Sequence, residues 1–154
     1  MIEEQIKALG LTLPAVPVPL AAYIPAVKTG NLVFTSGQIP MLDGILKYKG
    51  KVGASVSEGE AKHAAEIAVL NCLAVIKSIV GNLELVERVI KVTVFVNSDP
   101  GFVNQPEVAN GASELLVKIF GDKGKHARAA VGVNVLPRDA SVEIEMLVET
   151  KDND

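Results

Sequence analysis

The strongest constraint on the fold is a long apolar helix predicted between residues 57 and 81. Ser57 and Glu60 have the spacing of a capping box, in which a hydroxyl lies three residues before a glutamate. The apolar sequence AKHAAEIAVLNCLAVIKSIV follows, and Gly81 suits the left-handed conformation that ends many helices. At 1.5 Å per residue this helix would be about 35 Å long. We therefore expect the main core helix here.

Strand signals lie on both sides of this helix. YIPAVKTG and NLVFTSGQI flank a turn at residues 29–31 and predict an antiparallel pair of strands. The stretch DGILKYKGKVG could add a third short strand. RVIKVTVFVN is β-branched on both faces, which is typical of a strand inside a sheet. These segments predict a sheet whose strands lie before and after the helix in the sequence.

A second helix is predicted around ELLVKIF, with Pro106 and Asn110 as candidate start signals. The resulting order, β-β-(β)-α-β-α-β-β, indicates an α+β fold, with both helices on one face of a mostly antiparallel sheet. The other face of the sheet then needs a cover, and no third helix is predicted. We therefore expect a homo-oligomer that buries sheet against sheet.

Composition excludes several classes of protein. The 154 residues are 49% apolar and 21% charged, which predicts one globular domain over residues 1–154. The acidic start MIEEQIKALG is unlike a signal sequence, and the single Cys72 cannot form an internal disulfide, so we expect a cytoplasmic protein. Four prolines interrupt the apolar residues 11–25, which predicts an extended arm and not a membrane span.

Ligand classes are also limited by the sequence. A net charge of −3 and six aromatic residues argue against a broad nucleic-acid surface, which needs clustered basic residues. Two widely separated histidines and one cysteine within a helix do not have the spacing of a metal site. We expect no metal.

Arg128 stands out within the apolar segment KHARAAVGVNVLPRDASVEIEM, residues 125–146. The segment resembles a hairpin, in which Arg128 shares a strand face with Ala130 and Gly132. With a four-residue turn at residues 137–140, Arg128 would lie opposite Glu149, and Glu143 would lie ~20 Å farther along the strand. Arg128 and Glu143 of one chain are therefore not expected to meet.

Two interpretations of Arg128 are open on this evidence. It could pair with a glutamate across the hairpin, as charged residues on strand faces often do. Alternatively, its small neighbours Ala130 and Gly132 leave open space beside a guanidinium that is suited to binding a carboxylate. The second interpretation predicts a small anionic ligand.

Four motifs then resemble a known family. TSGQIP at 35–40, VTVFV at 92–96, HARAAVGVNVLP at 126–137 and VEIEM at 142–146 are similar, in order and spacing, to the reactive intermediate deaminase family, RidA or YjgF, also called L-PSP endoribonuclease. The resemblance spans about residues 20 to 149. NGASELL at 110–116 and GKHAR at 124–128 resemble a longer subgroup of that family.

The resemblance implies a fold, an assembly and a reaction. The implied fold is a chorismate-mutase-like α+β fold of the bacillus type, with a mixed sheet and two helices on one face. The implied assembly is a homotrimer with clefts between subunits. Family members with this arginine hydrolyse reactive enamine and imine acids of the 2-aminoacrylate type to 2-oxo acids and ammonia, without metal or cofactor. The expected ligand is thus a small carboxylate-bearing metabolite.

The resemblance also assigns site residues. Arg128 would bind the substrate carboxylate, and Glu143 would position or polarise the attacking water. The other implied binding residues are Tyr23, Ser36, Gly37, Ala130, His126 and Asn110. Because Arg128 and Glu143 are expected to lie apart in one chain, two different subunits would supply them.

Departures from the family pattern keep two other functions open. Ala129 and Ala130 replace residues that usually carry a hydroxyl or thiol, and His126 replaces a proline. His126 is either an acid/base group beside Arg128 or a surface histidine at a strand edge. One alternative is a regulatory trimer that binds a small carboxylate without turnover. The other is an endoribonuclease or translation inhibitor, which the acidic composition does not favour.

Overall fold

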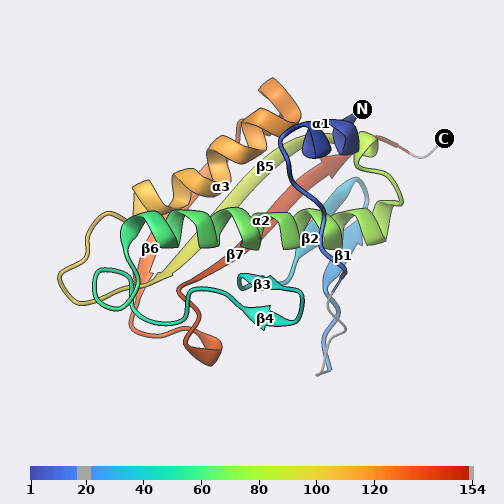
Figure 1. Cartoon of the computed structure of the whole chain (residues 1–154). Helices are drawn as coiled ribbons and strands as arrows, with labels where there is room; N and C mark the ends of the chain where they lie inside the picture. Colours follow the sequence, from blue (N-terminus) through green and yellow to red (C-terminus); the bar gives the residue numbers. More distant parts are fainter. Residues whose placement is uncertain (17–21, 153–154) are drawn as a thin grey trace.

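The computed structural model describes residues 1–16 and 22–152 and contains a five-stranded mixed sheet with its long helices on one face (Figure 1). The strand order is β1-β2-β7-β5-β6. The strands of this sheet are β1 (Ala26–Thr29), β2 (Leu32–Thr35), β5 (Val86–Asn97), β6 (Ala127–Val133) and β7 (Val142–Thr150). The helices are α1 (Ile2–Ala8), α2 (Glu58–Val80) and α3 (Gln105–Phe120). The predicted α+β class, with α2 and α3 on one face, is confirmed.

Helix α2 forms where the sequence predicts it. The Glu60 N–H donates to Ser57 Oγ at 3.1 Å, the Ser57 N–H donates to Glu60 Oε2 at 3.1 Å, and Gly81 ends the helix at a φ of 84°. The helix has the length and hydropathy of a membrane span, but 67% of its most apolar window is buried inside the fold. The helix is therefore a core helix that covers the sheet.

Strand β5 is an interior strand, as expected from its β-branched sequence. It pairs with β7 on one side and with β6 on the other. Val92, Val94 and Val96 have no exposed surface, and they face the helices. Thr93 and Phe95 alternate with them and are only partly buried. In a single chain β5 is thus fully covered on one face only.

The predicted hairpin of residues 125–146 is wrong. Strand β6 pairs with β5 in parallel, whereas β7 is antiparallel to β5 and lies between β5 and β2. Arg128 therefore lies beside Val92 instead of Glu149, and Glu143 lies beside Phe95 instead of Asn134. Strand β5 separates the two strands that the sequence presents as neighbours.

The connection between β6 and β7 explains this arrangement. Arg138 and Asp139 both have a positive φ, of 58° and 59°, so the chain passes through left-handed backbone in this connection. The buried side chain of Asn97, at the end of β5, donates to Asp139 Oδ1 and to the Ala140 carbonyl, each at 3.0 Å. These bonds hold the connection across the end of β5, so β7 enters on the far side of that strand.

Three shorter segments differ from expectation. Helix α1 was not predicted, and its residue Ile6 is buried against the core. The stretch expected to give a third strand contains only β4 (Ile45–Leu46), which pairs with β3 (Met41–Leu42), just before the stretch, in a small separate hairpin. Residues 11–16 and 22–25 of the predicted arm form neither helix nor strand, and residues 17–21 lie outside the described residues.

Helix α3 begins at Gln105, beside the predicted start signal Pro106 and before the other predicted signal, Asn110. Asn104 is the N-cap, and Pro106 lies in the first turn, where a missing N–H costs nothing. Pro106 is therefore confirmed as a start signal. Asn110 lies inside the helix, so its interpretation as a start signal is wrong. Its side chain instead faces β6, where it contacts Arg128.

The sheet face away from the helices is uncovered in the described part of one chain. Val27, Phe34 and Val131 are 50%, 44% and 43% exposed on this face, and Glu145 lies beside them on β7. Large apolar side chains at such exposure are typical of a surface that contacts another protein. The sequence predicted that one face of the sheet would need a cover, and the exposed apolar side chains on this face agree with that prediction.

Candidate active site

Arg128 is held against helix α3. Its Nη1 donates to Asn110 Oδ1 at 2.8 Å and to Ser113 Oγ at 3.3 Å. Asn110 and Ser113 are three residues apart on one helix, so both side chains face the same strand. The predicted salt bridge between Arg128 and a glutamate across a hairpin is therefore wrong.

His126 belongs to the same group of side chains. Its Nε2 lies 2.9 Å from Ser113 Oγ, and its Nδ1 lies 2.6 Å from the carbonyl oxygen of Gly124. Burial is the main cause that lowers the pKa of His126, and the positive charge of Arg128 lowers it further. The residue is half-buried and lies just before β6, which is an edge strand of the sheet.

These contacts leave one edge of the Arg128 guanidinium available. A guanidinium has five N–H donors, and the two on Nη1 point to Asn110 and Ser113. Within residues 1–16 and 22–152, no side chain bonds Nε or Nη2. The edge formed by Nε and Nη2 presents two parallel donors, which is the geometry that binds a carboxylate in a bidentate manner.

A second group of predicted residues lies around Glu143, at the start of β7. Glu143 lies over the backbone of Gly37, and a Cβ added to Gly37 would overlap Glu143 Oε1. Ser36 Oγ donates to the Ile24 carbonyl at 2.7 Å, which ties residues 36–37 to the segment containing Tyr23. Tyr23, which precedes Ile24 in the sequence, is exposed. This group comes from β2, β7 and the arm.

The protein surroundings of Glu143 favour the protonated form of its carboxyl group, compared with the same group in water. Burial raises the pKa of Glu143, and the negative charge of Glu145 on the same strand face raises it further. A carboxylate with a raised pKa is a stronger base than an ordinary carboxylate, which suits general acid/base catalysis. Glu143 therefore has the electrostatic character of an acid/base group.

One chain does not bring the two groups together. Arg128 and Glu143 pair with Val92 and Phe95, three residues apart on β5, and lie two strand spacings from each other. Their Cα atoms are therefore about 14 Å apart. Their side chains also lie on opposite faces, because Arg128 contacts α3 while Glu143 lies on the uncovered face. Arg128 and Glu143 of one chain therefore do not meet, as expected, although the hairpin from which this was predicted is wrong.

Part of the open space expected beside Arg128 is occupied, because the side chains of Gln105 and Ser98 lie next to Gly132. Ala130 and Gly132 share the face of Arg128, as their alternation predicts, but this face is turned toward the helices. A Cβ at Gly132 would lie 2.8 Å from Gln105 Nε2 and 3.0 Å from Ser98 Oγ. Ala130 packs against the core. The small residues thus allow close packing along β6, and any ligand space lies nearer to Arg128 itself.

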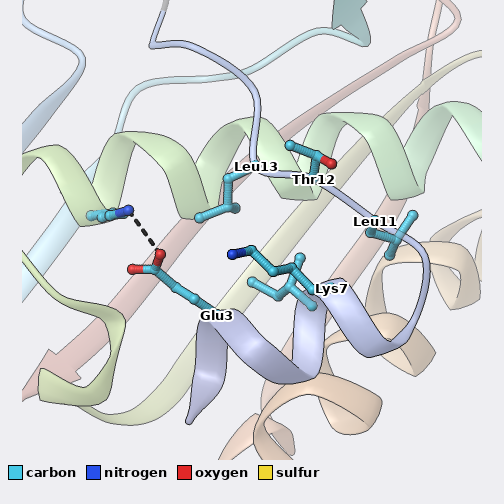
Figure 2. Close-up of a pocket in the computed structure, with 7 residues that line it drawn as sticks. Glu3, Lys7, Leu11, Thr12 and Leu13 are labelled. Carbon is cyan, nitrogen blue, oxygen red and sulfur yellow. Dashed lines mark hydrogen bonds and ion pairs between the residues drawn. The ribbon is translucent and has the colours of Figure 1, made fainter.

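Other chemistry-bearing groups lie elsewhere. The described ranges contain no group of three His, Cys, Asp or Glu side chains that could hold a metal. Cys72 is fully buried in α2, and burial raises its pKa to about 12. A cavity of about 180 Å³ between α1 and α2 is lined by Lys7, Leu13 and an ion pair of Glu3 and Lys77 at 3.0 Å (Figure 2). None of the predicted site residues lines this cavity.

Comparison with known proteins identifies the family. A family model described as "YjgF/chorismate_mutase-like, putative endoribonuclease" matches residues 3–150. The chain belongs to the YjgF family. The model covers both groups of residues described above, and the chorismate-mutase-like fold is confirmed with it.

Several members of the YjgF family are similar over nearly the whole chain. Protein TCP17 of Trypanosoma cruzi is 41% identical over 96% of this chain and 93% of its own. The crystal structure of the Agrobacterium tumefaciens protein Atu1372, of unknown function, is 46% identical over 97% of this chain and 92% of its own, with a TM-score of 0.92. A Dermatophagoides farinae protein named 2-iminobutanoate/2-iminopropanoate deaminase is 30% identical over 90% of this chain and 93% of its own.

One residue of the group around Arg128 escaped the sequence prediction. Ser113 links Arg128 to His126, yet nothing in its own sequence context marks it as part of a site. Its spacing of three residues from Asn110 is the signal that could have found it, because this spacing places both side chains on one helix face. That signal becomes useful only when Asn110 is known to face β6 of the YjgF fold.

Proposed function

We propose that the protein hydrolyses small enamine and imine acids of the 2-aminoacrylate type to 2-oxo acids and ammonia. The observation that carries this proposal is the Nε and Nη2 edge of Arg128, which is held by Asn110 and Ser113 in a position to bind a carboxylate. The family membership and the similarity to a mite protein named as an iminobutanoate deaminase support the same reaction class.

The proposed chemistry needs only binding and proton transfer. An enamine first becomes the imine, when its terminal carbon takes a proton and its nitrogen loses one. Water then adds to the carbon of the C=N bond and gives a tetrahedral amino alcohol. The nitrogen then takes a proton and leaves as ammonia, while the hydroxyl loses its proton and becomes the oxo group. Arg128 binds the carboxylate and orients this carbon. Glu143 accepts the proton of the water and returns a proton to the nitrogen, which its raised pKa favours.

The site we propose is completed by a second copy of the chain. Arg128 and Glu143 are about 14 Å apart at Cα in one chain and lie on opposite faces of the sheet. The uncovered sheet face supplies the apolar surface for an assembly, and we propose a homotrimer with clefts between its subunits. Glu143, Gly37, Ser36 and Tyr23 of one subunit would face the Arg128 group of the next.

The remaining expectations follow from this proposal. Ala130 would line the cleft next to Arg128 through its backbone, because its side chain packs against the core. The whole chain would act as one domain in the cytoplasm, where enzymes that use pyridoxal phosphate release such imines. The substrate carboxylate is the only ligand that this reaction needs besides water.

The experiment that tests the function measures imine hydrolysis directly. The purified protein is added to an amino-acid oxidase or a dehydratase that generates imines, and release of ammonia and 2-oxo acid is followed. We expect acceleration over spontaneous hydrolysis that is lost in Arg128→Ala. Lys118→Ala serves as the matched control, since it removes one positive charge from an exposed position on α3.

The alternatives give different results in the same experiment. If several small imines are hydrolysed no faster than in buffer, while 2-oxobutanoate still binds in an Arg128-dependent manner, the protein is a carboxylate-binding protein without turnover. Cleavage of RNA by the wild-type protein that is lost in Arg128→Ala would instead favour the endoribonuclease.

A further inference from the structure

We propose that Ser113 and His126 are positioning residues for Arg128: His126 holds the Ser113 hydroxyl proton, so that Ser113 Oγ faces Arg128 as an acceptor. This inference rests on the proposed role of Arg128 in binding a substrate carboxylate. It assigns His126 a role different from the acid/base or surface role expected from sequence.

The tautomer of His126 follows from its contact with Gly124. Nδ1 lies 2.6 Å from the carbonyl oxygen of Gly124, and a carbonyl oxygen can only accept a hydrogen bond. Nδ1 therefore carries the proton. In a neutral imidazole Nε2 then has a lone pair and is an acceptor, and the burial that lowers the pKa of His126 keeps the ring neutral.

The orientation of the Ser113 hydroxyl follows from that tautomer. Ser113 Oγ lies 2.9 Å from Nε2 of His126, so the hydroxyl is the donor in this bond. With its only proton used, Ser113 Oγ offers lone pairs to Arg128 Nη1, which lies 3.3 Å away. The direction of every bond from the Gly124 carbonyl to the guanidinium is thus determined.

The consequence concerns the geometry of the carboxylate site. Asn110 and Ser113 together accept both protons of Nη1, which prevents rotation of the guanidinium plane and directs the Nε and Nη2 edge away from α3. A ligand with a carboxylate then binds without first ordering a long, flexible side chain. Neither Ser113 nor His126 needs to touch the ligand, because both have their polar atoms bonded to protein.

The first test reads the tautomer without any ligand. The chain has two histidines, so ¹⁵N NMR spectra of the wild type and of His126→Gln identify the His126 signals. We expect a protonated Nδ1 and an unprotonated Nε2 at neutral pH. A proton on Nε2 would overturn the proposal, whatever the protein does to imines.

The second test is a double-mutant cycle on carboxylate binding, with 2-oxobutanoate as the probe. We expect Ser113→Ala and His126→Phe each to weaken binding of 2-oxobutanoate and to raise KM about tenfold, the effect of losing one hydrogen bond to a charged group, with a smaller change in kcat. In the Arg128→Ala background the same substitutions should have no further effect. Ser113→Thr keeps the hydroxyl group and should bind 2-oxobutanoate as the wild type does.

The outcomes separate this inference from the proposed function. If the wild type hydrolyses imines while Ser113→Ala and His126→Phe bind and react as the wild type does, the positioning role is overturned and the function stands. If the wild type binds 2-oxobutanoate with the expected coupling but does not hydrolyse imines, the function fails and the positioning role stands. Failure of the folded wild type to bind 2-oxobutanoate would overturn the positioning role.

Discussion

The carboxylate of Glu143 lies over the backbone of Gly37 so closely that the Cβ of any other residue at position 37 would overlap Glu143 Oε1. Gly37 does not have a positive φ, so this close approach is the reason that the position needs glycine. The contact links the motif around residues 35–40 to the start of β7 and fixes where the carboxylate can lie.

Gly37→Ala is therefore expected to displace the Glu143 carboxylate. The overlapping atom is at the end of a flexible side chain, so it can move at little cost in folding free energy. We expect imine hydrolysis to fall by about 10-fold or more, with a thermal midpoint close to that of the wild type. Gly101→Ala, in an exposed turn where the added Cβ would meet only Asp99 Oδ2 at an ordinary contact distance of 4.0 Å, is the control. A fully active Gly37→Ala would contradict the role of this contact.

Glu143→Gln should separate activity from stability. Loss of an acid/base group is expected to lower kcat by about 10²–10⁴-fold. The folded state raises the pKa of Glu143, so its contribution to stability is present below the ordinary pKa and is lost as pH rises through the raised value. At neutral pH the ionised carboxylate therefore costs stability. Thermal unfolding should show Glu143→Gln to be as stable as the wild type, or slightly more so.

Glu145→Gln is the matched control for that prediction, because Glu145 lies on the same strand face two residues away. We expect it to retain activity. Since the charge of Glu145 contributes to the raised pKa of Glu143, its removal should lower the pKa seen in the pH profile of kcat. A large loss of activity in Glu145→Gln, with Glu143→Gln unaffected, would reverse the assignment of the two carboxylates.

Gly111→Ala should destabilise the protein, although alanine is normally favoured in helices by about 1 kcal/mol. A Cβ at Gly111 would overlap the Lys62 carbonyl oxygen, which belongs to the backbone of α2 and cannot move independently. We expect a loss of about 1–3 kcal/mol in the free energy of unfolding, measured by urea denaturation. Gly59→Ala, on α2 with nothing within 4 Å of the added Cβ, should show no such loss.

Cys72 should be unreactive in the folded protein. With a pKa raised to about 12, its thiolate fraction at pH 8 is on the order of 10⁻⁴, and the side chain has no exposed surface. A thiol reagent such as dithionitrobenzoate should react with less than one equivalent in native buffer over an hour and with one equivalent in denaturant. Rapid reaction of the native protein would show that α2 opens more readily than its burial indicates.

Local signals explain why the two long helices and the interior strand were predictable. The capping box at Ser57 and the glycine at position 81 act within their own helix ends, so they determine the bounds of α2 in any tertiary context. The alternation of Arg128, Ala130 and Gly132 is likewise a local property, and these residues do share one face of β6. Helix α1 carries weaker signals, with Glu3 and Glu4 in its first turn and Lys7 in its last. A helix of seven residues depends on tertiary burial, here that of Ile6, for its stability.

The sequence by itself determined the two long helices and the five strands of the main sheet, and its motifs indicated the candidate site residues. Only the tertiary structure decided that β5 lies between β6 and β7, that Arg128 faces α3, and that Ser113 connects it to His126. The physical reason is that an alternating strand offers the same side chains and the same backbone groups to any neighbour. The choice of neighbour is made by contacts between distant parts of the chain, such as those of Asn97 with the 139–140 turn.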